Sequence, residues 1–445
     1  MVRAINACAC AVAVVLASSA SSRAEKPMTL ETKLATAVMK GGQTQKNFLR
    51  IALGGCERPP TERTPVNVAF VIDRSGSMQG SRIAQAREAA ITAIRRLDAN
   101  DIASVVVFDD KIEMLVPAQP VADHNAFADR IRQVDARGST AIYGGVTEGA
   151  NAVRANKDNK RLNRVVLLSD GLANVGPRNP SDFEKLGRDL LAEGISVSTI
   201  GLGMGYNEDL MLKLARASDG NHTFVGDATD LIQVFNKEFD DVLGSCAQTV
   251  SIDVEVNPGV RVVRALSRDG KIEGQKAQFL MNQVYQATEH YLLLEVEVDQ
   301  SIASGDGNLG RVAVAYTAPQ DGSRQTLEAT ILGRFSTSDT EIAASRDNAV
   351  LESVVEQSVR LRTEKAIALR DQGKAAEARA LFYDNVTEIE TQAAAAPLSD
   401  RLEYLKKQYK AITATPPAAA AGAWGGQRKM LRQMDTNPAS PGSRY

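Results

Sequence analysis

Between residues 66 and 243, short apolar runs alternate with helix-like segments, and this alternation most constrains the fold. The run VNVAFVI at Val66–Ile72 is typical of a strand that is buried on both faces. Similar runs occur at Ala103–Phe108, Arg164–Leu168 and Ser196–Ile200. Because such alternation forms a mainly parallel sheet with helices on both faces, we predict a doubly wound α/β domain over residues 61–246.

The segment before this domain has a strand-like pattern. Apolar stretches at Leu34–Met39 and Phe48–Leu53 lie on either side of the pair Gly41-Gly42. Glycine pairs between apolar runs favour a tight turn that joins two antiparallel strands. We therefore predict a β-hairpin within residues 25–60.

The chain after residue 246 changes its pattern twice. Residues 247–336 contain strand-like runs separated by turn pairs such as Pro258-Gly259, which predicts a β-sandwich. Residues 337–413 have apolar side chains at helical spacing, which predicts a helical segment. Residues 414–445 are rich in Pro, Ala and Gly, and we expect a disordered tail there because this composition buries little apolar surface.

The first 24 residues have the pattern of a secretory signal peptide. Arg3 is followed by an apolar stretch over Ala4–Ala20, and Ser22-Arg23-Ala24 offers a cleavage site. The alternative is a short membrane anchor, but the stretch is short for a span. No later stretch is long and apolar enough to cross a bilayer. We therefore expect an exported protein, periplasmic or secreted, without a transmembrane span after signal cleavage.

Removal of the signal would leave two of the four cysteines, Cys56 and Cys246. In an oxidising compartment we expect these two to form a disulfide, and the alternative is a pair of buried thiols. They lie just before the first strand and just after the last helix of the α/β domain, so pairing would bring its two ends together. We then expect residues 25–60 to join the later β-sandwich, with the α/β domain inserted.

The charges exclude one broad class of function. The chain has 52 Lys and Arg against 54 Asp and Glu, a formal net charge of -2. This balance argues against a nucleic-acid-binding surface, which needs an excess of basic side chains. The chain has only three widely spaced histidines, which disfavours both a histidine-based metal cage and a Ser/His/Asp triad.

Five oxygen-bearing side chains follow predicted strands or precede a predicted helix. Asp73, Ser75 and Ser77 form a D-x-S-x-S pattern directly after the first buried strand. Thr140 precedes a helix, and Asp170 follows another buried strand. In doubly wound sheets, ligands bind at the carboxyl ends of the strands. Because oxygen ligands suit hard divalent cations, these residues are candidate metal ligands.

These five residues resemble the metal-ion-dependent adhesion site (MIDAS) of von Willebrand factor type A (VWA) domains, whose fold is Rossmann-like. The segments VNVAFVIDRSGSM, VVLLSDGLANVGP and GISVSTIGLGMGYNEDL also resemble exported bacterial VWA proteins that are similar to inter-α-trypsin-inhibitor heavy chains. The resemblance implies that Ser75, Ser77 and Thr140 bind Mg²⁺, Mn²⁺ or Ca²⁺ directly. It implies that Asp73 and Asp170 bind directly or through water, and that a Glu or Asp of a protein partner completes the shell.

The resulting hypothesis is an exported, adhesion-like protein-binding module without catalytic residues. Three alternatives remain open. In the first alternative, Asp73, Ser75 and Ser77 bind no metal and only cap a helix and a turn. In the second, a structural cell-envelope protein uses the metal only to stabilise its loops. The third is a metal-dependent hydrolase, which lacks an evident general base.

Overall fold

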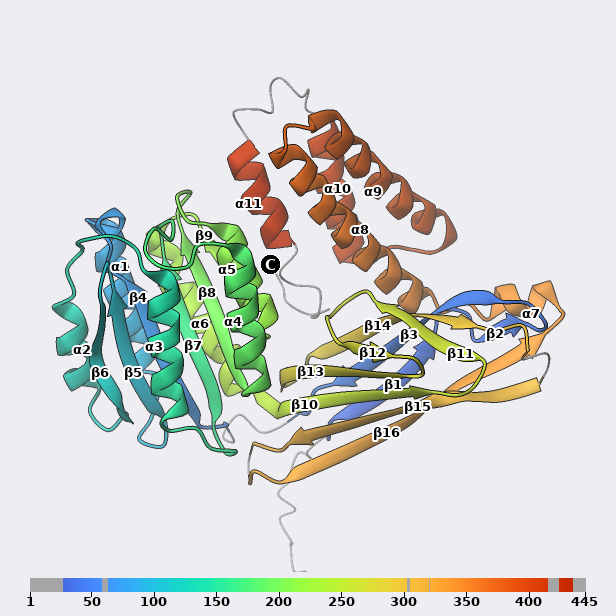
Figure 1. Cartoon of the computed structure of the whole chain (residues 1–445), viewed down its shortest axis with the longest axis horizontal. Helices are drawn as coiled ribbons and strands as arrows, with labels where there is room; N and C mark the ends of the chain where they lie inside the picture. The colour runs from blue at the N-terminus through green and yellow to red at the C-terminus, as the bar shows by residue number, and fades with distance from the viewer. Residues whose placement is uncertain (1–26, 58–62, 302–304, 320, 415–423, 435–445) are drawn as a thin grey trace, which may run out of the picture.

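The computed structural model describes residues 27–57, 63–301, 305–319, 321–414 and 424–434, and the predicted signal peptide at 1–24 lies outside them. These residues form an α/β domain, two further sheets that pack as a sandwich, and a group of C-terminal helices (Figure 1). The predicted fold class is thereby confirmed. Among the described residues, no helix combines the length and the apolar character that a membrane crossing requires.

The α/β domain is built on a six-stranded sheet with the order β6-β5-β4-β7-β8-β9. All neighbouring strands are parallel except β5 and β6. The strands are β4 (Val66–Asp73), β5 (Ile102–Phe108), β6 (Ile112–Pro120), β7 (Leu162–Ser169), β8 (Ile195–Leu202) and β9 (His222–Val225). The helices are η1 (Gly76–Met78), α1 (Ser81–Ile94), α2 (His124–Arg132), α3 (Ile142–Arg154), α4 (Pro180–Ala192), α5 (Glu208–Ala217), η2 (Ala228–Asp230) and α6 (Leu231–Leu243).

The burial of strand β4 explains why its sequence does not alternate between apolar and polar residues. All eight of its residues are buried, because both faces of the sheet are covered by helices. Val68, Phe70 and Ile72 point into a core shared with α1, α2 and α6. Ala69 and Val71 point into a second core shared with α3, α4 and α5.

The residues before the α/β domain contribute strands to both sheets of the sandwich. The first sheet has the order β1-β3-β14-β11, and the second has the order β12-β13-β10-β15-β16-β2. The first sheet contains β1 (Thr29–Leu34), β3 (Gln45–Gly54), β14 (Glu289–Val298) and β11 (Val260–Ala265). The second contains β12 (Lys271–Glu273), β13 (Lys276–Tyr285), β10 (Ser245–Val256), β15 (Gly305–Thr317), β16 (Arg324–Ser336) and β2 (Val38–Lys40). The α/β domain is therefore inserted into the sandwich.

The N-terminal hairpin differs from the predicted one in its first arm. Strand β3 pairs with β1, whereas Val38–Lys40 leaves the hairpin and pairs in parallel with β16. The chain bends between them at Thr36, whose backbone N–H and C=O are both bonded to the side-chain amide of Asn47, at 3.2 and 2.7 Å. This amide satisfies both backbone groups of Thr36 at the bend, and the apolar stretch is divided there between two sheets.

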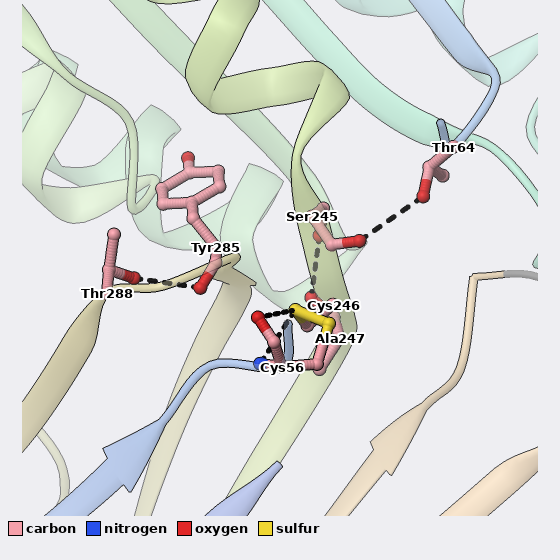
Figure 2. The surroundings of a disulfide bond; sticks show 7 residues. All are labelled: Cys56, Thr64, Ser245, Cys246, Ala247, Tyr285 and Thr288. Atoms are coloured by element: carbon pink, nitrogen blue, oxygen red, sulfur yellow. Dashed lines mark hydrogen bonds between the residues drawn. A yellow bond between two sulfur atoms is a disulfide. The ribbon is translucent and has the colours of Figure 1, made fainter. Parts of the chain in front are cut away.

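A disulfide between Cys56 and Cys246 closes the two ends of the insertion (Figure 2). Cys56 follows β3, and Cys246 lies at the start of β10, 190 residues later in the chain. Both residues are buried in the core of the sandwich. The covalent link therefore fixes where the α/β domain leaves and re-enters the sandwich.

A buried arginine also joins the α/β domain to the sandwich, through the end of β13. Arg164 on β7 is completely buried and donates to the Ser198 hydroxyl at 2.9 Å. It also donates to the Gln283 carbonyl oxygen at 2.6 Å and the Tyr285 hydroxyl at 2.7 Å, both on β13, and pairs with Glu238 on α6. A buried guanidinium requires such partners, so this network restrains the contact between the two domains.

The C-terminal helices form a separate core. They are α8 (Asn348–Asp371), α9 (Ala375–Ala395), α10 (Asp400–Ala414) and α11 (Trp424–Met434), whereas the short α7 (Asp339–Ala344) buries no residue and contacts β2 and β16. Phe382 and Tyr409 stack in this core, and Leu431 and Met434 of α11 are buried in it. Helix α11 lies within the segment that we expected to be disordered, and it is placed between the other helices and the α/β domain (Figure 1).

Ion pairs explain why α11 is ordered despite the composition of the segment around it. Arg428 pairs with Glu208 and Asp209 at the start of α5 and with Asp371 at the end of α8. Lys429 pairs with Glu208 at 2.8 Å. Glu208 and Asp209 also lie in the first turn of α5, where their negative charges interact favourably with the helix dipole.

We expect the double variant Cys56→Ser/Cys246→Ser to lose about 2–4 kcal/mol of unfolding free energy, because the disulfide restricts the unfolded chain. Guanidinium denaturation followed by circular dichroism measures this loss. The wild-type protein under reducing conditions serves as the control and should behave like the double variant. Equal stability of oxidised wild type and double variant would contradict the prediction.

We expect Arg428→Gln to loosen α11, because this guanidinium connects three carboxylates on two other helices. Trp424 is the only tryptophan and donates to Asp371 at 2.9 Å, so intrinsic fluorescence reports on the position of α11. The variant should show a red-shifted emission and stronger quenching by acrylamide. Arg324→Gln, an exposed change on β16 with the same loss of charge, should leave both unchanged; an unshifted spectrum in Arg428→Gln would refute the prediction.

Candidate metal centre

The five candidate ligands lie at one edge of the α/β sheet. Asp73 is the last residue of β4, and Asp170 directly follows β7. Because β4 and β7 are neighbouring parallel strands, their carboxyl ends meet at the same edge. Ser75 and Ser77 follow in the turn and in η1, and Thr140 lies two residues before α3 begins.

Hydrogen bonds connect four of these residues in sequence. The Ser75 backbone N–H donates to Asp73 Oδ1 at 2.7 Å, and the hydroxyls of Ser75 and Ser77 are 3.0 Å apart. The Ser77 hydroxyl donates to Asp170 Oδ1 at 2.6 Å. The two carboxylates are therefore linked through the backbone N–H and hydroxyl of Ser75 and the hydroxyl of Ser77, and the structure brings the D-x-S-x-S motif and Asp170 together.

Thr140 lies beside the same cluster, and both it and Ser77 are close to Gly171. A Cβ atom at Gly171 would lie 3.1 Å from Thr140 Oγ1 and 3.4 Å from Ser77 Oγ, so both hydroxyls face this glycine. Asn174 fixes the Thr140 backbone, because its side-chain carbonyl accepts from Thr140 N at 2.7 Å. All five residues thus meet at one place, and their binding of a metal stays a prediction.

Backbone hydrogen bonds hold the contributing loops against one another. Gly76 N donates to Gly138 O at 3.1 Å, and Arg137 N donates to Arg74 O at 2.6 Å. The loop before α3 is therefore attached to the loop after β4. This attachment fixes the approach of Thr140 to the serines.

The spacing of the oxygens fits a small divalent cation. Neighbouring ligand oxygens around Mg²⁺ are about 3 Å apart, since each lies about 2.1 Å from the ion in an octahedron. The separations of 3.0 Å between Ser75 and Ser77 and 2.6 Å between Ser77 and Asp170 are close to this value. No group of three or more His, Cys, Asp or Glu side chains in the described part of the chain has an arrangement suited to a metal, so a cation at this edge depends on hydroxyl ligands.

Burial controls the charge of Asp73. Burial raises the pKa of Asp73 to about 6, and the nearby Asp170 carboxylate adds to this rise. Hydrogen bonds from Ser169 and Ser75 oppose it by stabilising the ionised form. A buried carboxylate that resists ionisation favours a cation beside it, because the cation supplies the charge compensation that water would otherwise give.

Ser169 and Arg82 complete the cluster, and neither was among the residues predicted from the sequence. The Ser169 hydroxyl donates to Asp73 Oδ2, and its position directly before Asp170 at the end of β7 was a usable signal. Arg82 Nη1 donates to Asp170 Oδ2 at 2.6 Å and to Ser77 O at 3.0 Å. No motif distinguished Arg82 from the other basic residues of a solvated helix face.

His124 and His222 have partners away from the cluster. His222 is buried, with Nδ1 2.8 Å from Thr199 Oγ1 and Nε2 3.3 Å from the Tyr206 hydroxyl. His124 Nε2 lies 2.9 Å from Leu97 O. Burial, with a smaller effect from Lys429, lowers the pKa of His222 to about 3. A neutral, buried imidazole with these contacts supports the structure of the domain.

The family comparison covers the first part of the α/β domain, where residues 68–172 match the model of the von Willebrand factor type A domain. The chain is 26% identical to an uncharacterized protein of Synechocystis sp., sll0103, over 64% of this chain and 70% of that protein. It is 27% identical to human inter-alpha-trypsin inhibitor heavy chain H3 over 35% of this chain. That alignment spans only 18% of the human heavy chain, so it concerns a shared domain and not the whole relative.

Two solved structures share nearly the whole architecture. A von Willebrand factor type A protein from Catenulispora acidiphila superposes with a TM-score of 0.72 at 16% identity, covering 95% of this chain and 99% of that chain. The ArnB paralog VWA2 from Sulfolobus acidocaldarius gives a TM-score of 0.61 at 16% identity, covering 93% and 98%. At such low identity the likeness concerns the fold alone.

We expect the stability of the protein to fall as the pH is lowered from 6.5 towards 3, in part through His222. Below pH 6.5 the unfolded imidazole takes up a proton that the buried one does not bind until about pH 3. This difference lowers the unfolding free energy by up to about 1.4 kcal/mol per pH unit. Urea denaturation at several pH values measures the slope.

His222→Gln should therefore show a shallower decline with falling pH than the wild type. Its stability above pH 6.5 gives the separate cost of the lost contacts to Thr199 and Tyr206. Burial also lowers the pKa of His290, to about 4, but this residue contributes equally to the pH dependence of both proteins. Parallel pH profiles for the two proteins would show that His222 does not act in this way.

Proposed function

Because the chain contains a von Willebrand factor type A domain, we propose that it is an exported protein-binding module that holds its partner through a divalent cation. The observation that carries this proposal is the linked cluster of Asp73, Ser75, Ser77 and Asp170 at one sheet edge, with Thr140 beside it. Three hydroxyls and two carboxylates supply hard oxygen ligands and little excess negative charge.

In this proposal Ser75, Ser77 and Thr140 bind Mg²⁺, Mn²⁺ or Ca²⁺ through their hydroxyls. Asp73 and Asp170 bind the ion directly or through water. The bound cation bridges to a Glu or Asp carboxylate of the partner protein, which completes the coordination shell. The residues of this chain orient the ion and need not change covalently, so the proposed activity is binding and not catalysis.

A hydrolytic role has less support from the same residues. Metal-dependent hydrolysis needs a group that activates water within hydrogen-bonding reach of the ion. In the described residues, neither His124 nor His222 has a hydrogen-bond partner in the cluster. Asp73 and Asp170 are already engaged by serine side chains. We therefore propose a non-enzymatic module.

The disulfide supports the proposed compartment. Cys56 and Cys246 are joined in the sandwich core, and such bonds persist in secreted and periplasmic proteins. A secretory signal over residues 1–24, which lies outside the described residues, would deliver the chain there. Together these features favour a periplasmic or secreted protein.

We expect Mg²⁺ to raise the melting temperature of the wild-type protein and to have no such effect on Asp73→Asn. The substitution keeps the size of the side chain and removes the buried charge that favours the cation. Differential scanning calorimetry with Mg²⁺ and with EDTA measures the effect. Asp135→Asn, at a side chain that is 89% exposed, is the control with the same change of charge and should behave like the wild type.

Pull-down from envelope extracts tests the bridging role of the ion. We expect the wild type to capture a partner in Mg²⁺, and neither the wild type in EDTA nor Asp73→Asn in Mg²⁺ to do so. Equal capture with and without Mg²⁺, together with a Mg²⁺-dependent melting temperature, would replace the proposal with a metal that only stabilises the loops. A melting temperature that does not respond to Mg²⁺, Mn²⁺ or Ca²⁺ would overturn it.

A further inference from the structure

We infer that Arg82 sets the charge of the proposed metal centre, so that the loaded site is cationic and selects an anionic partner group. The inference rests on the proposed function and names a residue that determines its specificity. Arg82 lies in the first turn of α1, and its Nη1 donates to Asp170 Oδ2 at 2.6 Å and to Ser77 O at 3.0 Å. It therefore contacts two of the proposed ligand residues directly.

The guanidinium has a defined place between two loops of the sheet edge. A Cβ atom at Gly203 would lie 3.5 Å from Arg82 Nη2, so the loop after β8 borders the other side of the group. The Arg82 side chain is 43% exposed, whereas the Asp170 side chain is fully buried. Arg82 thus presents a positive charge at the surface while it compensates a buried carboxylate.

Asp170 divides its two oxygens between a neutral donor and a cationic donor. Its Oδ1 accepts from the Ser77 hydroxyl, and its Oδ2 accepts from Arg82. A divalent cation that binds beside Asp170 therefore meets a carboxylate whose charge is already shared with a guanidinium. Because like charges repel, Arg82 weakens the binding of the cation.

The positive charge of Arg82 strengthens the second binding step, in which a carboxylate of the partner binds to the metal-loaded centre. The carboxylates of Asp73 and Asp170 balance a divalent cation, and a site made of these groups alone is neutral. Arg82 adds one positive charge, so the loaded centre attracts and neutralises a carboxylate of the partner. Arg82 therefore has opposite effects on the two binding steps, which a residue that only stabilises the fold would not have.

The test uses the purified full chain with Mn²⁺ as the metal probe and acetate as the carboxylate probe. Electron paramagnetic resonance of free Mn²⁺ gives the metal affinity. The water-proton relaxation of bound Mn²⁺ reports the displacement of coordinated water by acetate. We expect Arg82→Gln to bind Mn²⁺ about ten-fold more tightly and acetate about ten-fold more weakly, since one unit charge near the ion is removed.

Two further variants separate charge from structure. Arg95→Gln removes the same charge from an exposed position just after α1 and should leave both affinities unchanged. Arg82→Lys keeps the charge and should retain the wild-type values. If Arg82→Lys instead changes both affinities as much as Arg82→Gln does, the effect is one of shape, and the inference is overturned.

The remaining outcomes distinguish this inference from the proposed function. A wild-type protein that binds no Mn²⁺ would overturn the proposed function itself. Wild-type Mn²⁺ binding with equal or weaker affinity in Arg82→Gln would overturn only the role of Arg82. Tighter Mn²⁺ binding and weaker acetate binding in Arg82→Gln, with both controls unchanged, would establish it.

Discussion

Strand β3 pairs with β14 along its whole length, from Gln45 opposite Val298 to Gly54 opposite Glu289. This ladder joins residues on either side of the α/β domain, and the remaining architecture depends on it. The disulfide between Cys56 and Cys246 closes the chain just beyond the ladder, and Arg164 connects the inserted domain to β13. The inserted domain is thus held at both of its ends and by the Arg164 contact, which together define its orientation relative to the sandwich.

The sheet of the inserted domain then determines the chemistry of its exposed edge. Parallel β4 and β7 end side by side, so Asp73 and Asp170 approach although 97 positions separate them in the numbering of the chain. Two serine hydroxyls lie between the carboxylates, and Arg82 lies over Asp170. The edge therefore combines hard oxygen ligands with one fixed positive charge.

The fold class followed from the sequence because strands such as β4, buried on both faces, leave a continuous apolar run. The division of the N-terminal hairpin between two sheets could not be predicted from the sequence, because it depends on hydrogen bonds between the Asn47 side chain and the Thr36 backbone. Helix α11 was missed because its partners Glu208 and Asp371 are distant in the chain. The motif indicated which oxygens meet, but the place of Arg82 depends on how α1 packs against the loop after β8.

Helix α11 also makes the tertiary structure sensitive to loss of the residues from Trp424 onward. Leu431 and Met434 fill the core of the C-terminal helices, while Arg428 binds the start of α5 in the inserted domain. A product that terminates before Trp424, through early translational arrest or proteolysis, leaves apolar surface on those helices and unpaired acids on α5. Helix α11 thus couples the stability of the C-terminal helices to that of the inserted domain, because one short element supplies apolar side chains to the first and cations to the second.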